Sequence, residues 1–189
     1  MNYSLKKFNK LVEALEALPT IGKKSATRLA YHMVMRDSFC ALKLTGAIEE
    51  ALSHIKECAS CGGMCEDEIC HICSDDRRDK SLLCIVESAK DILLLEENGL
   101  FDGYYFVLEN INDNLLTKLI ANVQSGVKEI VFALTPCIQN DALMLFIEDK
   151  LKGLDVSYTK IAQGVPTGVS LENIDTLSLS RALQDRVKV

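Results

Sequence analysis

The sequence contains no long hydrophobic run, and this absence excludes a membrane-spanning helix. The longest apolar stretches, such as Ile92–Leu95 and Leu143–Ile147, are far shorter than the roughly 20 residues that cross a bilayer. The first ten residues carry Lys6, Lys7 and Lys10 but no apolar segment of the kind found in secretion signals. We therefore expect a cytoplasmic protein that does not act at a membrane.

An excess of positive charge is also absent, because the formal net charge is -6 at pH 7. This excludes a protein coated with cations for nucleic acid, so any such binding has to be local. A local basic region exists, because up to Arg36 seven Lys and Arg residues stand against only Glu13 and Glu16. The sequence shows no internal repeat, and 189 residues that are 48% hydrophobic are enough to build a core.

Cysteine, by contrast, is abundant, and half of the eight cysteines form two C-x-x-C pairs. Cys58 and Cys61 make the first pair, and Cys70 and Cys73 make the second. Soft thiolates at this spacing favour tetrahedral Zn²⁺, and a closed four-sulfur site leaves no open position for chemistry. A disulfide framework is the weaker alternative, because no route to an oxidising compartment is visible. We predict a structural zinc site.

We predict structural roles for the other four cysteines and for His71. Cys65 and His71 lie within the loop but off the paired spacing, so we interpret them as a spare thiol and a loop residue. Cys40, Cys84 and Cys137 stand singly in apolar surroundings, which predicts small core residues.

The N-terminal segment is predicted to be entirely helical. Apolar residues recur at helical spacing up to Leu18, again after Gly22, and a third time up to about Glu57. The third helix is expected to turn six apolar residues inward: Leu44, Ala47, Ile48, Ala51, Leu52 and Ile55.

The chain after the cysteine loop changes pattern. A charged stretch, 75–80, is interpreted as solvated linker. Strand-like and helical segments then alternate, which predicts β-α-β units and a mostly parallel sheet with flanking helices. The predicted strands are 82–86, 104–108, 129–134 and 156–162, and the predicted helices are 89–97, 114–124 and 141–151. Ligand sites in such folds lie beyond the carboxyl ends of the strands, here at Glu87, at 109–110 and at 135–141.

The short turn at Pro19 joins two of the predicted helices and is a candidate nucleic-acid contact. The start of the second helix exposes unpaired N–H groups, and Lys23, Lys24 and Arg28 add positive charge. Such an arrangement would hold a phosphate backbone without reading bases. The alternative is a helical hairpin with ordinary surface lysines.

The residues from Leu18 to Met33 form a helix-hairpin-helix motif, Leu-Pro-Thr-Ile-Gly-Lys-Lys-Ser-Ala-Thr-Arg-Leu-Ala-Tyr-His-Met, and resemble the RecR family of bacterial recombination mediators. The resemblance continues in order through Cys70–Asp79, Leu83–Glu87 and Ile161–Pro166, and so covers nearly the whole chain.

The resemblance implies an α/β protein of four parts. These are a helix-hairpin-helix DNA-binding region at 1–56, a four-cysteine zinc loop at 57–80, a Toprim domain at 81–163, and a C-terminal tail at 164–189. We expect the tail to serve in assembly; the alternative is that it folds back onto its own sheet. The resemblance also implies a non-catalytic scaffold that forms dimers or ring-like tetramers, acts with RecO and RecF, and helps to load RecA onto gapped or single-stranded DNA. The protein would then be associated with the nucleoid during repair.

The family's DNA contacts fall on Lys24 and Arg28, with Lys23 as an additional charge where the family usually has proline. The sequence departs from the family at Thr20, where a glycine is usual, and this narrows the allowed backbone of the turn. The loop at 109–114 is also shorter, and Gln139 stands where a glutamate is expected.

The acidic residues bear on a rival hypothesis, a Mg²⁺-dependent Toprim nuclease or primase. Such reactions need several carboxylates at one site. Only Glu87 and Asp141, with Asp91 nearby, could contribute, and Glu87 could equally be a partner contact or a helix N-terminal carboxylate. A protein-interaction module without DNA binding is a further alternative. The position of the cysteine loop in the sequence suggests that it fixes the angle between the helical segment and the sheet.

Overall fold

The computed structural model describes residues 5–109, 111–162, 170–174, 176, 178, 180 and 182. The chain divides into two compact units, Met1–Ile55 and Lys56–Val189. Among the described residues, no helix combines the length and the apolar character that a membrane span requires. Asn110 and most of the predicted tail at 164–189 lie outside the described residues; the described part of the tail consists of the short 3-10 helix η1 (Leu171–Asn173) and six single positions around it.

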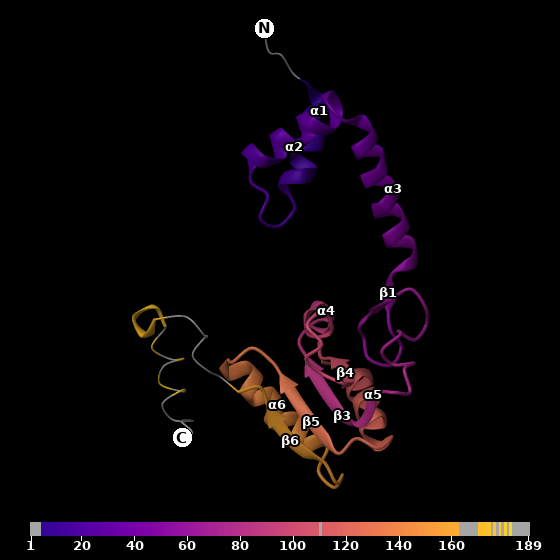
Figure 1. Cartoon of the computed structure of the whole chain (residues 1–189), viewed down its shortest axis with the longest axis vertical. Coiled ribbons are helices and arrows are strands. Elements are labelled where there is room, and N and C mark those ends of the chain that lie inside the picture. Colours follow the sequence, from indigo (N-terminus) through magenta and orange to yellow (C-terminus); the bar gives the residue numbers. More distant parts are fainter. Residues whose placement is uncertain are drawn as a thin grey trace. The chain divides into compact units, whose positions relative to one another are not determined.

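Unit 1 consists of three helices, as predicted (Figure 1). They are α1 (Lys6–Glu16), α2 (Lys23–Met35) and α3 (Ser38–His54). The core of the unit is small: Ala26 and Ala30 of α2 are fully buried against Val12 of α1. Alanine at these positions lets the two helices approach closely, and this packing fixes the hairpin between them.

The prediction that α3 turns its apolar residues inward is wrong. No described residue of α3 is buried, and Leu52 is 80% exposed. The helix also ends at His54 and not near Glu57, because residues 56–57 form a strand. The apolar stripe that predicted a core helix is an uncovered surface of this chain.

Unit 2 is built on a four-stranded parallel sheet in the order β4-β3-β5-β6, which confirms the predicted α/β fold. The strands are β3 (Asp79–Val86), β4 (Gly103–Val107), β5 (Glu129–Ala133) and β6 (Ser157–Lys160). The helices are α4 (Ala89–Glu97), α5 (Asp113–Gln124) and α6 (Ile138–Lys150). Ser88 and Asp91 form a capping box at the start of α4, and Asn112 caps α5.

The two faces of the sheet are covered differently, because side chains of β3 alternate between them. Leu83 and Ile85 point into a core formed with α5 and α6. Cys84 and Val86 point to the other face, where they pack with Ile92 of α4 and with the cysteine loop. The sheet therefore lies between two helices on one side and a helix with the cysteine loop on the other (Figure 1).

The cysteine loop contains a small hairpin that was not predicted from the sequence. Strand β1 (Lys56–Glu57) pairs antiparallel with β2 (Met64–Cys65). The loop belongs to the compact unit of the sheet, since Cys58, Cys61 and Cys70 are buried in the same core as Cys84.

Candidate metal centre and hairpin surface

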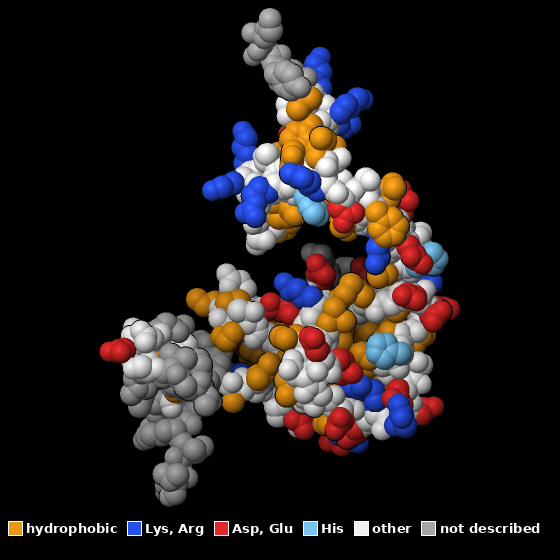
Figure 2. Space-filling view, turned by 45° about the horizontal axis from the view of Figure 1, so that its top comes forward, with side chains coloured by type: hydrophobic (Ala, Val, Ile, Leu, Met, Phe, Trp, Pro, Cys, Tyr) orange, Lys and Arg blue, Asp and Glu red, His pale blue; other side chains and the backbone are white. Residues whose placement is uncertain are grey.

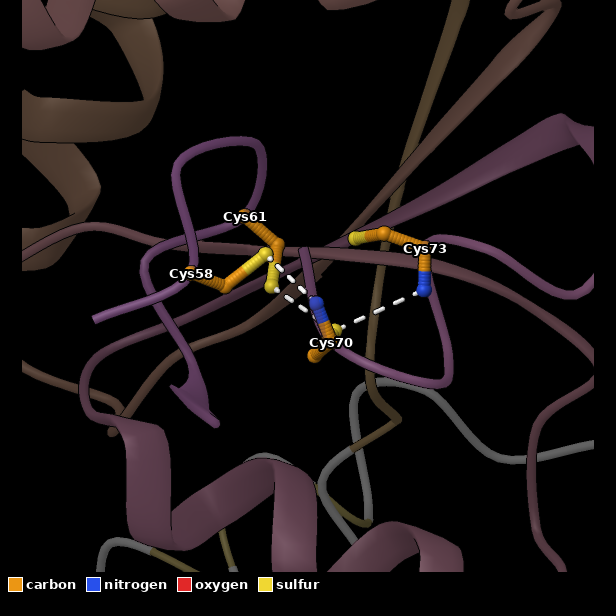
Figure 3. A group of neighbouring side chains, drawn as sticks. All are labelled: Cys58, Cys61, Cys70 and Cys73. Atoms are coloured by element: carbon orange, nitrogen blue, oxygen red, sulfur yellow. Dashed lines mark hydrogen bonds between the residues drawn. The ribbon is translucent and has the colours of Figure 1, made fainter. Parts of the chain in front are cut away.

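Four cysteine side chains converge in the loop, and they are the four of the two C-x-x-C pairs (Figure 3). The sulfurs of Cys58, Cys61, Cys70 and Cys73 all lie within 4.8 Å of one another, and the first three residues are buried. Backbone N–H groups support the sulfurs: Gly63 donates to Cys61 at 3.3 Å, and Cys70 donates to Cys58 at 3.3 Å.

The residues present fit a zinc ion. Four Zn–S bonds of about 2.3 Å in tetrahedral array place the sulfurs about 3.8 Å apart. The Sγ atoms of Cys61 and Cys70 are 3.7 Å apart, and none of the four cysteines forms a disulfide. The four thiolates would complete the coordination of Zn²⁺ and leave no position for a substrate, so the ion would be structural.

The pKa values of these thiols indicate that the four thiolates need a cation beside them. Burial raises the pKa of Cys58, but N–H donors from Cys61, Cys70 and Ser60 outweigh it and lower the pKa to about 7. Burial raises the pKa of Cys70 to about 11. The hydrogen bond with Cys73, followed by burial, raises the pKa of Cys61 well above its ordinary value. Four thiolates cannot coexist here without a counter-charge, which a metal ion supplies.

The first C-x-x-C pair is fixed to β4 and α5 by two hydrogen bonds that its backbone carbonyls accept. The N–H of Val107, the last residue of β4, donates to the carbonyl of Cys61 at 2.8 Å. Asn122 of α5 donates through its side chain to the carbonyl of Ser60 at 3.2 Å. Gly62 has φ of +76°, and a side chain there would meet Val107 at 3.3 Å. Glycine is therefore required at this position for two reasons, conformation and space.

The segment 75–80 is largely exposed, as predicted, but it is not a linker throughout: Arg78 is anchored to the sheet unit, and residues 79–80 already belong to β3. Arg78 donates to both carboxylate oxygens of Glu96, at 2.9 and 2.6 Å, and to the carbonyls of Phe101 and Gly103, each at 2.8 Å. Its side chain is only 15% exposed. Nothing in the sequence distinguishes it from its neighbour Arg77, whose side chain is 88% exposed.

The remaining cysteines differ from one another. Cys65 and His71 are not part of the group of converging ligands, and the Cys65 thiol donates to the carbonyl of Asp67 instead. Cys84 is buried, as predicted, and burial raises its pKa to about 12. Cys137 is half-buried, and the prediction that Cys40 is a core residue is wrong because it is exposed on α3.

The hairpin of unit 1 presents an open helix start. Gly22 is the N-cap of α2, and no side chain caps the first turn. The first intrahelical bond runs from the N–H of Ala26 to the carbonyl of Gly22, so the N–H groups of Lys23, Lys24 and Ser25 have no acceptor within the helix. A Cβ atom added at Gly22 would meet nothing within 4 Å. No neighbouring group therefore crowds the chain at Gly22.

Thr20 adopts the backbone conformation that a glycine would adopt without strain. Its φ is +68°, in the left-handed region, and it is the one residue other than glycine with a positive φ in the described part of the chain. A β-branched residue there costs about 1–2 kcal/mol. Threonine in place of the family's usual glycine therefore keeps the left-handed conformation of the turn, but the backbone at Thr20 is strained.

Positive charge gathers over this unit (Figure 2). Residues 1–55 contain eight Lys and Arg residues against five Asp and Glu residues. Every ion pair found among the described residues lies between positions 75 and 155, in unit 2. The side chains of Lys23, Lys24 and Arg28 are therefore not neutralised by carboxylates of the described chain.

The three acidic candidates of unit 2 are not assembled into a metal site. Glu87 accepts hydrogen bonds from the N–H and hydroxyl of Thr135, at 2.6 and 3.1 Å, and from the side chain of Asn140 at 2.5 Å. Asp91 accepts from the N–H and hydroxyl of Ser88 in the capping box. In the described part of the chain, the four cysteines are the one group of three or more converging metal ligands, so Asp141 does not join Glu87 in such a group.

Asn140 is a residue that was not singled out from the sequence. It donates both to Glu87 and to the carbonyl of Thr135, and so closes the loop between β5 and α6 over the end of β3. The sequence offered one indication of its importance: it lies in the segment 135–141 beyond a strand end, where a ligand site was expected. That indication applied to the whole segment and did not single out Asn140.

Comparison with known proteins identifies the same parts. A family model described as "RecR, helix-hairpin-helix" matches residues 8–52, and one described as "RecR, C-terminal" matches residues 164–187. The model of the four-cysteine zinc finger domain of RecR matches residues 55–75. The zinc-finger match agrees with the cysteine geometry and confirms the predicted structural zinc.

Curated relatives match over the full length. A protein named "Recombination protein RecR" from a Nitratiruptor species is 57% identical over 190 residues, which cover 100% of both chains. The protein of that name from Campylobacter jejuni is 50% identical over 190 residues, again 100% of both chains. The one from Helicobacter pylori is 49% identical over 188 residues, which cover 98% of this chain and 96% of the relative.

Proposed function

The chain belongs to the RecR family of recombination proteins, and from this premise we propose that it is a DNA-binding scaffold of recombinational repair. In this proposal it assembles as an oligomeric clamp in the cytoplasm, at the nucleoid during repair. It acts with RecO and RecF to help load RecA onto gapped or single-stranded DNA. Binding is to the backbone and does not depend on sequence.

The observation that carries the proposal is the start of α2. Three backbone amides there have no intrahelical acceptor, and Lys23, Lys24 and Arg28 lie in the same two turns without ion-pair partners in the described chain. A helix start of this kind binds a phosphate, and the added cations strengthen the attraction.

The proposal includes no catalysis. A Mg²⁺-dependent nuclease or primase needs carboxylate oxygens with free lone pairs directed at one point. Both oxygens of Glu87 already accept hydrogen bonds from the β5–α6 loop, and Asp91 caps α4. We propose that Glu87 is a structural residue that ties the ends of β3 and β5 together. Asp141 then remains a candidate partner contact.

The proposal also includes self-assembly. Phe39, Leu42 and Leu52 on α3 are 76%, 71% and 80% exposed, which is unusual for large apolar side chains that do not meet a partner. A second copy would cover this surface, with the C-terminal tail as a further assembly element. Several hairpins on one assembly would bind DNA more tightly than one, through effective concentration. Light scattering during gel filtration gives the mass that tests this.

The test of DNA binding is a salt titration of the full chain. Binding of a fluorescent single strand is followed by anisotropy between about 50 and 200 mM salt, in the parent and in a double variant, Lys24→Ala with Arg28→Ala. Each lost phosphate contact lowers the slope of log K against log salt by about 0.7 for a single strand. The double variant should bind more weakly, with a slope lower by about 1–2.

A matched control removes two exposed lysines that lie outside the hairpin and form no ion pair in the described chain. Lys43→Ala with Lys90→Ala changes the net charge equally and should leave the slope unchanged. If the hairpin variant behaves like the parent, the protein is an interaction module without hairpin-dependent DNA binding.

The enzymatic alternative is tested separately. Purified protein is incubated with Mg²⁺ and labelled single- and double-stranded DNA, and the products are separated by electrophoresis. The proposal predicts intact DNA. Cleavage that disappears in Glu87→Ala would overturn the scaffold assignment.

A further inference from the structure

A groove runs along α2 beyond the open helix start, and is lined by cations and aromatic rings. Its volume is about 930 Å³, the size of a small-ligand site. Four of its residues, Ser25, Arg28, His32 and Arg36, recur at helical spacing on one side of α2. The rest of the lining comes from Phe8 of α1 and from Thr27, Leu29 and Tyr31 of α2.

The charge of the groove suits a nucleic-acid strand. Arg28 and Arg36 both line it, about two helical turns apart, and neither forms an ion pair among the described residues. The distance along the helix from Lys24 to Arg36 is about 18 Å at 1.5 Å per residue. This length passes several phosphates of one strand, so the groove continues the path that begins at the helix start.

The aromatic lining is not explained by phosphate binding alone. The ring of Tyr31 is 47% exposed, and the guanidinium carbon of Arg36 lies 5.8 Å from its centroid. The guanidinium lies over the ring, and the part of Tyr31 that stays exposed offers an aromatic surface on which a nucleobase can stack. Bases of a duplex are already stacked inside it and cannot reach such a ring, whereas those of a single strand can.

We propose that the groove binds single-stranded DNA by holding an unpaired base against Tyr31, while Arg28 and Arg36 bind the flanking phosphates. The inference rests on the proposed DNA-binding function and adds a base-stacking site to a hairpin that by itself contacts only the backbone. Stacking on Tyr31 is independent of sequence, because every base has an aromatic face.

The test compares an oligothymidylate of about 20 nucleotides with an abasic strand of the same length and charge. Anisotropy gives the affinity of the full chain for each strand at one salt concentration. The parent should bind the thymidylate about tenfold more tightly, the size of one stacked base. Tyr31→Ala should reduce this ratio to about one, while Tyr31→Phe, which keeps the ring, should preserve it.

The matched control is Phe146→Ala, which removes an exposed aromatic ring of α6 that does not line the groove and should preserve the ratio. A second readout requires no substitution: 2-aminopurine placed in the thymidylate should lose fluorescence on binding as it stacks. Its quenching should disappear with Tyr31→Ala.

The possible failures can be told apart. If the parent binds both strands equally, the base site is wrong and the proposed DNA binding stands. If the parent binds neither strand, the proposed function fails and the base site falls with it. If Tyr31→Ala keeps the preference for bases, the groove is not a base site. If Tyr31→Ala instead lowers the mass of the assembly, the groove is not a base site but a surface covered by another copy.

Discussion

Replacing Arg78 by alanine is expected to destabilise unit 2 much more than the same replacement at the adjacent Arg77. Arg78 binds both oxygens of Glu96 and two backbone carbonyls, and its guanidinium lies 5.7 Å from the ring centroid of Tyr105. Arg77 pairs only with Asp75, two positions away, and its side chain is 88% exposed. The two changes remove the same charge from neighbouring positions.

The loss of stability in Arg78→Ala follows from the groups that the substitution leaves without a partner. Glu96, with its side chain 26% exposed, would lose its cation and keep only the hydrogen bond from Tyr105. Breaking a fully buried ion pair costs about 3–5 kcal/mol, and partial exposure reduces this, while two carbonyls would lose a donor. We expect a loss of about 3 kcal/mol in the free energy of unfolding, or about 10 °C in melting temperature.

The assay is urea unfolding of the zinc-loaded protein, followed by circular dichroism, with the slope compared between variants. Arg77→Ala should unfold like the parent. Arg78→Lys should lie between the parent and Arg78→Ala, because an ammonium cannot make the bidentate contact with Glu96. Equal midpoints for Arg77→Ala and Arg78→Ala would refute the assignment of Arg78 as the residue that holds the loop.

Three further predictions follow from the geometry. Thr20→Gly should stabilise unit 1 by about 0.5–1 kcal/mol, measured by thermal unfolding, because it relieves the left-handed strain; a loss of stability would contradict this. Burial raises the pKa of Glu96, but hydrogen bonds from Arg78 and others outweigh it and lower the pKa overall. Stability from this pair should therefore be complete above pH 4.5, the ordinary value, and be lost as the pH falls below it; Glu96→Gln should flatten that acid limb of the unfolding profile. Cys58→Ser should abolish stoichiometric zinc and lower the melting temperature of unit 2, with assembly and DNA binding lost as a consequence, whereas Cys65→Ser should retain the metal. Unchanged folding after zinc removal would show that the cluster is not structural.

Much of the fold was predictable because its signals are local. The spacing of the cysteines defines a site within one loop, and the alternation of strands and helices defines a parallel sheet. The hairpin at Gly22 follows from the two amphipathic helices that flank it. Each of these patterns depends on near neighbours in the chain.

The errors concern contacts between distant residues. The apolar stripe of α3 has the pattern of a core helix, and no periodicity distinguishes an apolar face that the chain buries from one that it leaves exposed. Arg78 resembles the charged residues around it until its partner Glu96, 18 positions later, is placed beside it. The carboxylate of Glu87 accepts hydrogen bonds from Thr135 and Asn140, which lie about 50 positions away in the sequence.

Hydrogen–deuterium exchange can show whether the open start of α2 binds the DNA backbone. The amides of Lys23, Lys24 and Ser25 have no acceptor within the helix and should exchange rapidly in the free protein. Addition of single-stranded DNA should slow exchange in the peptide that contains them, and this protection should disappear at high salt. Protection confined to unit 2, with unchanged exchange at the hairpin, would show that the start of α2 does not bind DNA.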